Sequence, residues 1–157
     1  MKFVISTIIS VLFVVTFTLV SNAQTVPASV KKEVLAYLKK NCNESQLEHF
    51  EIYSEKVGPR KSGYIASCSS GGGTFVLYEK TPNGIKKLFE KEFGMNGGVS
   101  VGKVWNEKLQ RQETGPSFNG YYELYHSERS GPTVYGNTYR WNGSRYVLQK
   151  TEEFEVK

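Results

Sequence analysis

The stretch NTYRWNGSRYVLQ, Asn137–Gln149, places an Asn-Gly pair between two runs rich in aromatic and β-branched residues. In that setting Asn-Gly is a strong signal for a β-hairpin, because both residues tolerate the left-handed backbone of a tight turn. The same pair recurs at 83–84, 96–97 and 119–120. The sequence therefore predicts a mostly antiparallel sheet whose strands are joined by short turns.

The faces of the last predicted hairpin follow from its turn. If Asn142-Gly143 alone form the turn, Trp141 lies opposite Ser144 and an aromatic row shares one face. The row consists of Tyr135, Tyr139, Trp141, Tyr146 and Leu148. Arg140 and Arg145 then oppose each other on the second face, which should be wet because burying two like charges is costly. The aromatic row is therefore expected to be the hydrophobic closure of the sheet, and a binding surface only if nothing covers it.

A helix is predicted ahead of the sheet, over residues 26–41. Its apolar residues recur at helical spacing and form one stripe, which we expect to pack on the sheet. Residues 45–57 fit either a helix or a strand, with a strand favoured from Phe50 onward. The predicted fold class is α+β, with this helix on a mostly antiparallel sheet of about six to eight strands in one domain.

The first residues indicate export. Residues 1–23 have the layout of a signal peptide: a short basic start, an apolar run, and small residues before Gln24. An uncleaved signal anchor is the alternative, since the apolar run nearly reaches membrane-spanning length. With cleavage, residues 24–157 form the mature domain, which has no membrane span and is periplasmic or secreted.

Cys42 and Cys68 are expected to form a disulfide in the mature domain, the alternative being two buried thiols.

Composition excludes several functions. The net charge is +5, and no run of five basic residues suggests a nucleic-acid partner. The chain contains no Asp, which removes Asp-rich calcium loops and a Ser-His-Asp triad. His49 and His126 lack the close spacing of zinc ligands. We therefore expect no metal and no cofactor.

No catalytic motif is recognisable, so the sequence favours a non-enzymatic protein. The Gly-rich piece SCSSGGGTF, residues 67–75, lacks the Lys and the following helix of a phosphate-binding loop. Glu123 and His126 lie three apart in a predicted strand, so they should point to opposite faces and form no acid–base pair. A hydrolase that uses Glu and His in an unrecognised arrangement is the remaining enzymatic alternative.

The segments GYYELY (Gly120–Tyr125) and YRWNGSRYV (Tyr139–Val147) resemble the ends of small exported bacterial proteins with degenerate FG-GAP/VCBS-like β repeats. The resemblance covers roughly residues 63–153. It implies a β-rich, exported, non-enzymatic interaction module and identifies no ligand. The calcium loop of intact repeats needs Asp and is not carried over.

The leading hypothesis is a secreted or periplasmic protein that binds another exported protein through a β surface, one version being an inhibitor of an exported hydrolase or toxin. Exposed rigid aromatics and arginines are favoured at such interfaces. The candidate binding residues are Arg140, Arg145, Tyr121, Tyr122 and Trp141. The alternative is a carbohydrate-binding module of the cell envelope that uses Tyr139, Trp141 and Tyr146.

Overall fold

The computed structural model describes residues 25–94, 97–106 and 109–155, which form one domain. Two helices, α1 (Ala28–Leu38) and α2 (Glu44–Leu47), come first, and strands make up most of the rest. The predicted helix over 26–41 is confirmed in its central part, with both ends shorter. The predicted signal peptide lies outside the described residues. Within the described residues, no helix is long and apolar enough to cross a membrane.

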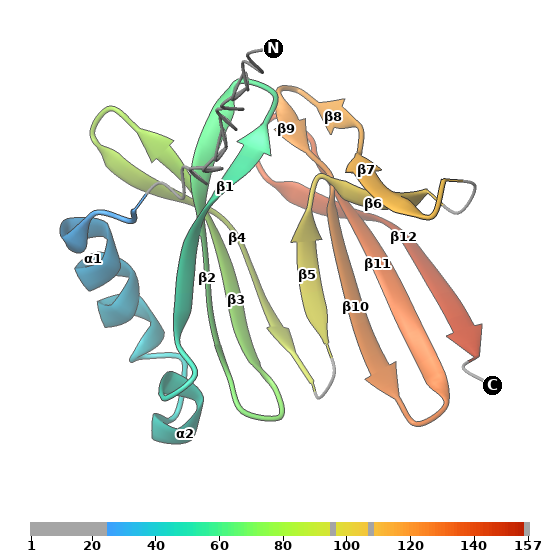
Figure 1. The fold of residues 1–157 in the computed structure, drawn as a ribbon, viewed down its shortest axis with the longest axis horizontal. Coiled ribbons are helices and arrows are strands. Elements are labelled where there is room, and N and C mark those ends of the chain that lie inside the picture. Colours follow the sequence, from blue (N-terminus) through green and yellow to red (C-terminus); the bar gives the residue numbers. More distant parts are fainter. Residues whose placement is uncertain (1–24, 95–96, 107–108, 156–157) are drawn as a thin grey trace, which may run out of the picture.

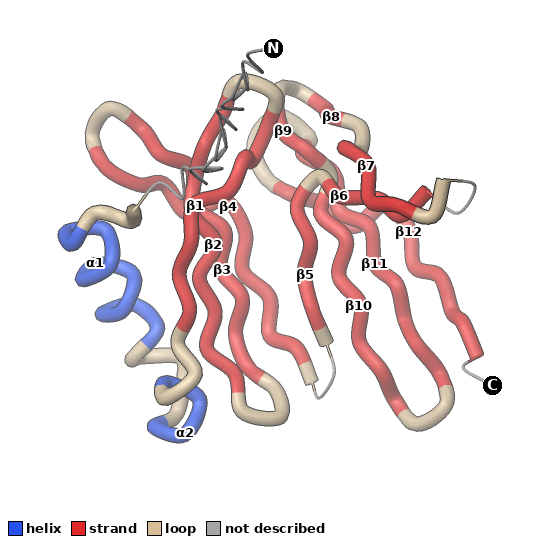
Figure 2. Tube along the Cα trace, viewed as in Figure 1, coloured by secondary structure: helices blue, strands red, loops and turns tan. Residues whose placement is uncertain are grey.

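Strands β1 (Glu51–Gly58), β2 (Lys61–Ser69), β3 (Gly73–Thr81) and β4 (Gly84–Phe93) form the first sheet, in chain order and antiparallel throughout. Figure 1 shows this sheet beside the two helices, and Figure 2 shows the short turns between its strands. Residues 82–83 turn the chain from β3 to β4, because Thr81 already pairs with Gly84, so the predicted hairpin forms one residue ahead of the Asn-Gly pair.

The second sheet has the order β12-β11-β10-β5 and is also antiparallel. Its strands are β5 (Gly98–Val101), β10 (Leu124–Ser130), β11 (Thr133–Trp141) and β12 (Tyr146–Glu155). Two small hairpins connect β5 to β10: β6 (Lys103–Asn106) with β7 (Arg111–Thr114), and β8 (Ser117–Phe118) with β9 (Tyr121–Tyr122). The mostly antiparallel β character is confirmed, whereas the single sheet of six to eight strands is wrong, because β5 pairs with β10 instead of extending the first sheet.

The two central strands of the first sheet, β2 and β3, are buried on both faces. Along β2 the side chains alternate, so Tyr64 and Ala66 pack under α1 while Ile65 faces the second sheet. Val34 and Leu38 of α1 are completely buried against this layer. The second sheet presents its inner face to the first sheet, and we call the opposite face its outer face.

The core between the two sheets is aromatic and aliphatic. Leu77 and Leu88 of the first sheet meet Leu124, Trp141 and Tyr146 of the second. Trp141 and Tyr146 are a cross-strand pair, with ring centroids 5.2 Å apart in an edge-to-face arrangement. Such pairs add about 1 kcal/mol beyond the burial of their area. The predicted role of the aromatic row as hydrophobic closure is confirmed for these two residues.

The last hairpin differs from the predicted two-residue turn. Trp141 pairs with Tyr146, so Asn142–Arg145 form a four-residue loop. The Asn142 side chain accounts for the extra length, since its Oδ1 accepts hydrogen bonds from the backbone N–H groups of Ser144 and Arg145, each at 3.0 Å. Arg140 pairs with Val147, so the predicted opposition of Arg140 and Arg145 is wrong.

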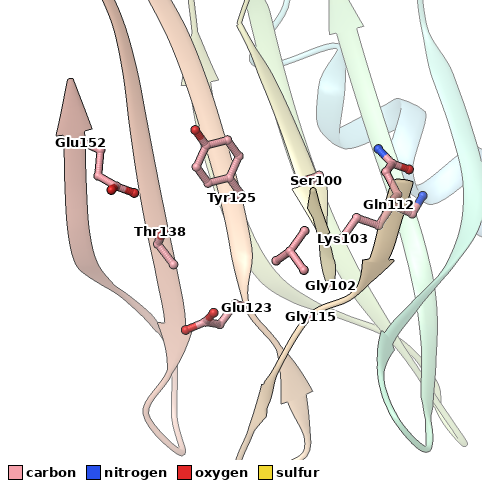
Figure 3. Close-up of a pocket in the computed structure, with 10 residues that line it drawn as sticks. Ser100, Gly102, Lys103, Gln112, Gly115, Glu123, Tyr125, Thr138 and Glu152 are labelled. Atoms are coloured by element: carbon pink, nitrogen blue, oxygen red, sulfur yellow. The ribbon is translucent and has the colours of Figure 1, made fainter. Parts of the chain in front are cut away.

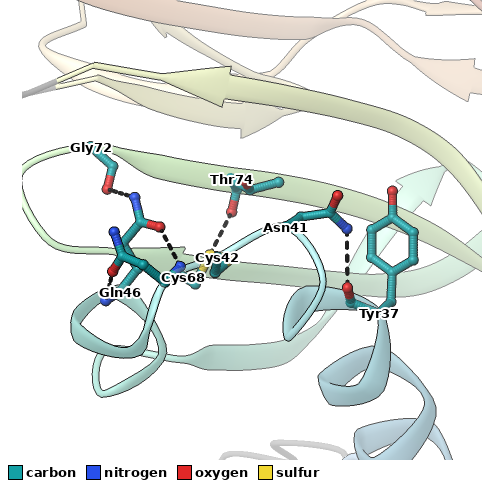
Figure 4. Close-up of a disulfide and its surroundings, with 8 residues drawn as sticks. Tyr37, Asn41, Cys42, Gln46, Cys68, Gly72 and Thr74 are labelled. Atoms are coloured by element: carbon teal, nitrogen blue, oxygen red, sulfur yellow. Dashed lines mark hydrogen bonds between the residues drawn. A yellow bond between two sulfur atoms is a disulfide. The ribbon is translucent and has the colours of Figure 1, made fainter.

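The predicted disulfide between Cys42 and Cys68 is confirmed. It joins the segment after α1 to β2, as Figure 4 shows. The Asn43 side chain caps α2 by accepting from the Gln46 backbone N–H, and the Gln46 amide donates to the Gly72 carbonyl at 3.1 Å. These contacts fix the helical layer to the first sheet at one end.

Candidate functional site

A cleft of about 440 Å³ lies on the outer face of the second sheet. The β6–β7 hairpin forms one of its walls, and all four strands of that sheet or the residues beside them contribute to its floor (Figure 3). The volume falls within the range of roughly 300–1,000 Å³ typical of small-molecule sites. The cleft is lined by Ser100, Gly102, Lys103, Val104, Gln112, Gly115, Glu123, Tyr125, Thr138 and Glu152.

Gly102 sends the chain over the outer face. The backbone breaks between β5 and β6 here, because Gly102 adopts φ +58°, a left-handed conformation that favours glycine. A Cβ at this position would lie 2.6 Å from Cγ of Tyr122. The Gly102 carbonyl accepts from the Gly115 backbone N–H at 2.8 Å, which closes the base of the hairpin.

Tyr125 is the aromatic residue of the cleft. It lies in the middle of the sheet, paired with Ser100 on β5 and Thr138 on β11. Its phenol reaches diagonally over Gly136, where an added Cβ would overlap the tyrosine oxygen. Because Gly136 has no side chain, the ring can lie close to the sheet and still line the cleft (Figure 3).

The charged groups of the cleft are all paired. Glu123 accepts two hydrogen bonds from Arg140, from Nε at 3.0 Å and from Nη2 at 2.8 Å. Glu152 pairs with Lys150 on the same strand. Lys103 reaches Glu55 on β1 at 3.2 Å, so the hairpin wall is also tied to the first sheet. These three ion pairs each join one cation to one anion, so the set is neutral.

Arg140 is fixed in place, unlike Arg145. The Arg140 guanidinium lies over the Phe118 ring, 3.6 Å from its centroid, while it holds Glu123. Arg140 does not line the cleft itself, and it affects the cleft by holding the Glu123 carboxylate in position. Arg145 lies in the exposed loop between β11 and β12 and does not line the cleft.

The three aromatic candidates from the sequence lie elsewhere. Tyr121 and Trp141 are 7% and 4% exposed, and their rings pack together with centroids 4.4 Å apart. Tyr122 is half-buried beneath Gly102. Tyr121 donates from its hydroxyl to Glu79 at 2.7 Å, and burial raises its pKa. These side chains hold the two sheets together and leave little surface for a ligand.

Sequence reasoning missed Tyr125, Thr138 and Glu152 as site residues. The sequence does hold a signal for Tyr125, because side chains alternate between the two faces of a strand. Leu124 and His126 are both fully buried in the core, so Tyr125 between them points to the outer face. The prediction that Glu123 and His126 point to opposite faces is confirmed, since Glu123 lines the cleft and His126 is buried. A buried histidine obscured the pattern, because histidine is less often fully buried than leucine or valine.

Among the described residues, no group of three or more His, Cys, Asp or Glu side chains is placed to hold a metal ion. Both cysteines are committed to the disulfide.

No family model, no curated protein and no solved structure matches this chain. The resemblance to FG-GAP/VCBS-like repeats therefore stays a prediction.

Proposed function

We propose that this chain is an exported, non-enzymatic binding protein whose ligand site is the cleft on the outer face of the second sheet. The observation that carries the proposal is the cleft itself, a concave site lined by both polar and apolar groups, on the sheet face that faces away from the core. The disulfide and the signal-like first 23 residues are compatible with export.

The chemistry of the cleft favours binding over catalysis. Its two carboxylates, Glu123 and Glu152, each lie in an ion pair. An ionised carboxylate only accepts hydrogen bonds, whereas a glycosidase-type acid must deliver a proton. The buried His126 lies on the other side of the sheet and does not reach this site.

A cleft-blocking variant tests the proposal. Thr138→Trp places a large ring on the cleft floor, and Thr133→Trp makes the same change on β11 outside the lining residues. Mature wild-type protein and both variants would be immobilised and exposed to the exported fraction of the native source. Bound protein and bound carbohydrate would then be identified by mass spectrometry and sugar analysis.

The wild type and Thr133→Trp should retain the same molecule, and Thr138→Trp should lose most of it. Equal retention by all three proteins, or specific retention by none, would contradict the proposal. Thermal melting of both variants separates a blocked cleft from an unfolded protein.

A further inference from the structure

We infer that the ligand of the cleft is a neutral carbohydrate that stacks on Tyr125, an inference that rests on the proposed function. Exported proteins and glycans are both candidate partners, and the two classes make different demands on a site. Charge, hydrogen-bonding capacity and the aromatic ring of the cleft each bear on the choice.

The balance of charge argues for a neutral ligand. Lys103, Glu123 and Glu152 line the cleft, and each already has an oppositely charged partner. An anionic polymer or a charged peptide side chain would find no excess of opposite charge in this set to offset the cost of its own desolvation. A neutral ligand can bond to the paired groups without breaking them, because a carboxylate offers about four acceptor sites.

The polar groups suit hydroxyls. A sugar hydroxyl both donates and accepts, so a matching site needs both kinds of group within a small volume. Glu123 and Glu152 accept, Lys103 donates, and Gln112 and Thr138 do both. A site for an apolar ligand would instead be lined mostly by hydrocarbon side chains.

The aromatic ring provides the apolar contact that sugars use. One face of a pyranose carries mainly C–H groups, which are attracted to the electron-rich face of an aromatic ring. Tyr125 is held against the sheet because Gly136 leaves space under its phenol. It is a platform with only two rotatable side-chain bonds, so it loses little conformational entropy on binding. The labelled side chains extend from Glu152 on β12 to Gln112 on the β6–β7 hairpin (Figure 3), which favours an oligosaccharide over a single sugar.

Binding to defined neutral oligosaccharides tests the inference. Mature protein would be titrated calorimetrically with glucose, mannose, galactose and N-acetylglucosamine oligomers, and with the anionic oligogalacturonate as a charged comparison. We expect binding to at least one neutral oligomer. The dissociation constant should change less than about twofold between low and high salt, because salt screens interactions between exposed charges and a neutral ligand carries none.

Variants of the platform locate the site. Tyr125→Ala should weaken binding about tenfold or more, since the stacking contact and its buried area are lost, while Tyr125→Phe should retain most of the affinity. Gly136→Ala should also weaken binding, because its Cβ displaces the tyrosine. Tyr53→Ala is the matched control, as Tyr53 is 44% exposed on β1 and lies outside the cleft.

The outcomes separate this inference from the function that it rests on. Absence of binding across the neutral oligomers, selective binding of the anionic one, or neutral binding that survives Tyr125→Ala would overturn the carbohydrate inference. If Thr138→Trp still abolishes retention of an exported protein in the capture experiment, the proposed function stands with a protein partner. If Thr138→Trp abolishes nothing, the proposed function fails as well.

Discussion

His126 is a fully buried ionisable side chain in the core. Its ring lies on the inner face of β10, and Nε2 has no hydrogen-bond partner among the described residues. Nδ1 lies 3.5 Å from the Asn137 amide, and Nε2 lies 3.9 Å from Glu128 Oε2. Burial lowers the pKa of His126, an effect that nearby Glu128 opposes and Lys91 of the first sheet reinforces.

This lowered pKa predicts a loss of stability in mild acid. Below about pH 6.5 the unfolded chain binds a proton at this histidine before the native state does, so the free energy of unfolding falls as pH falls towards the native pKa. His126→Gln should flatten this dependence, and His49→Gln, at an exposed position, should not. Urea unfolding at several pH values between about 8 and about 5.5 measures the slopes; equal slopes for wild type and His126→Gln would refute this account.

Gly143 supports a prediction about the backbone. It adopts φ +108° in the loop between β11 and β12, and a Cβ added there would have no atom within 4 Å. Gly143→Ala should therefore cost about 1 kcal/mol or more through backbone strain alone. Gly98→Ala is the control, because Gly98 also has open space but no positive φ. The urea midpoints of the two variants are compared, and equal losses of stability would show that the positive φ of Gly143 is not the source of the cost.

At the scale of elements, the disulfide should be a major support of the helical layer. It links positions separated by 26 residues, and a loop of that size contributes roughly 3 kcal/mol in the chain-entropy model. We expect reduction to lower the free energy of unfolding by about this amount, measured by guanidinium unfolding with and without reductant. The stability of a Cys42→Ala/Cys68→Ala variant should not change with reductant. If reductant destabilises this variant as much as the wild type, the loss of stability does not come from the disulfide.

Local signals predicted the elements that depend on neighbouring residues. The helix over 28–38 follows from the spacing of Val30, Val34 and Leu38, and the Asn-Gly pairs mark the hairpin turns at 82–83 and 119–120. The turn after Trp141 was predicted two residues too short, because the Asn142 side chain bonds to the backbone of a longer loop. The break at Gly102 also went unpredicted, since it depends on Tyr122, which is distant in sequence.

At the scale of the whole molecule, the two sheets share one core, so they should unfold together. Leu77 of the first sheet is completely buried in that core, and Leu77→Ala should cost about 2–5 kcal/mol. With Trp105→Phe as background, Trp141 in the second sheet becomes the single tryptophan reporter. Its fluorescence and far-ultraviolet circular dichroism should shift to the same new midpoint. Separate midpoints would mean that the sheets unfold independently.

The pairing of strands into two sheets was beyond local sequence reasoning. Alternation of residues such as Tyr64 and Ile65 assigns faces to a strand, but it does not say which strand lies beside it. The cleft depends on that pairing, since Ser100, Tyr125 and Thr138 become neighbours only when β5 and β11 pair with the two edges of β10. The burial of Trp141 and Tyr146 could be predicted from the faces of one hairpin, whereas Tyr121 was taken for a binding residue and the cleft was missed, because both depend on how distant strands pair.

The strand order also has a consequence for the sequence of events during synthesis. Every pairing of the first sheet joins successive strands, so residues 28–93 contain both helices, the whole sheet and both cysteines. A chain that emerges N-terminus first, from a ribosome or a translocation channel, has this half complete before β5 appears. Until Leu124, Trp141 and Tyr146 follow, the apolar face that contains Ile65 and Leu77 has no cover. That interval is when the nascent chain is most exposed to aggregation and has most need of a chaperone.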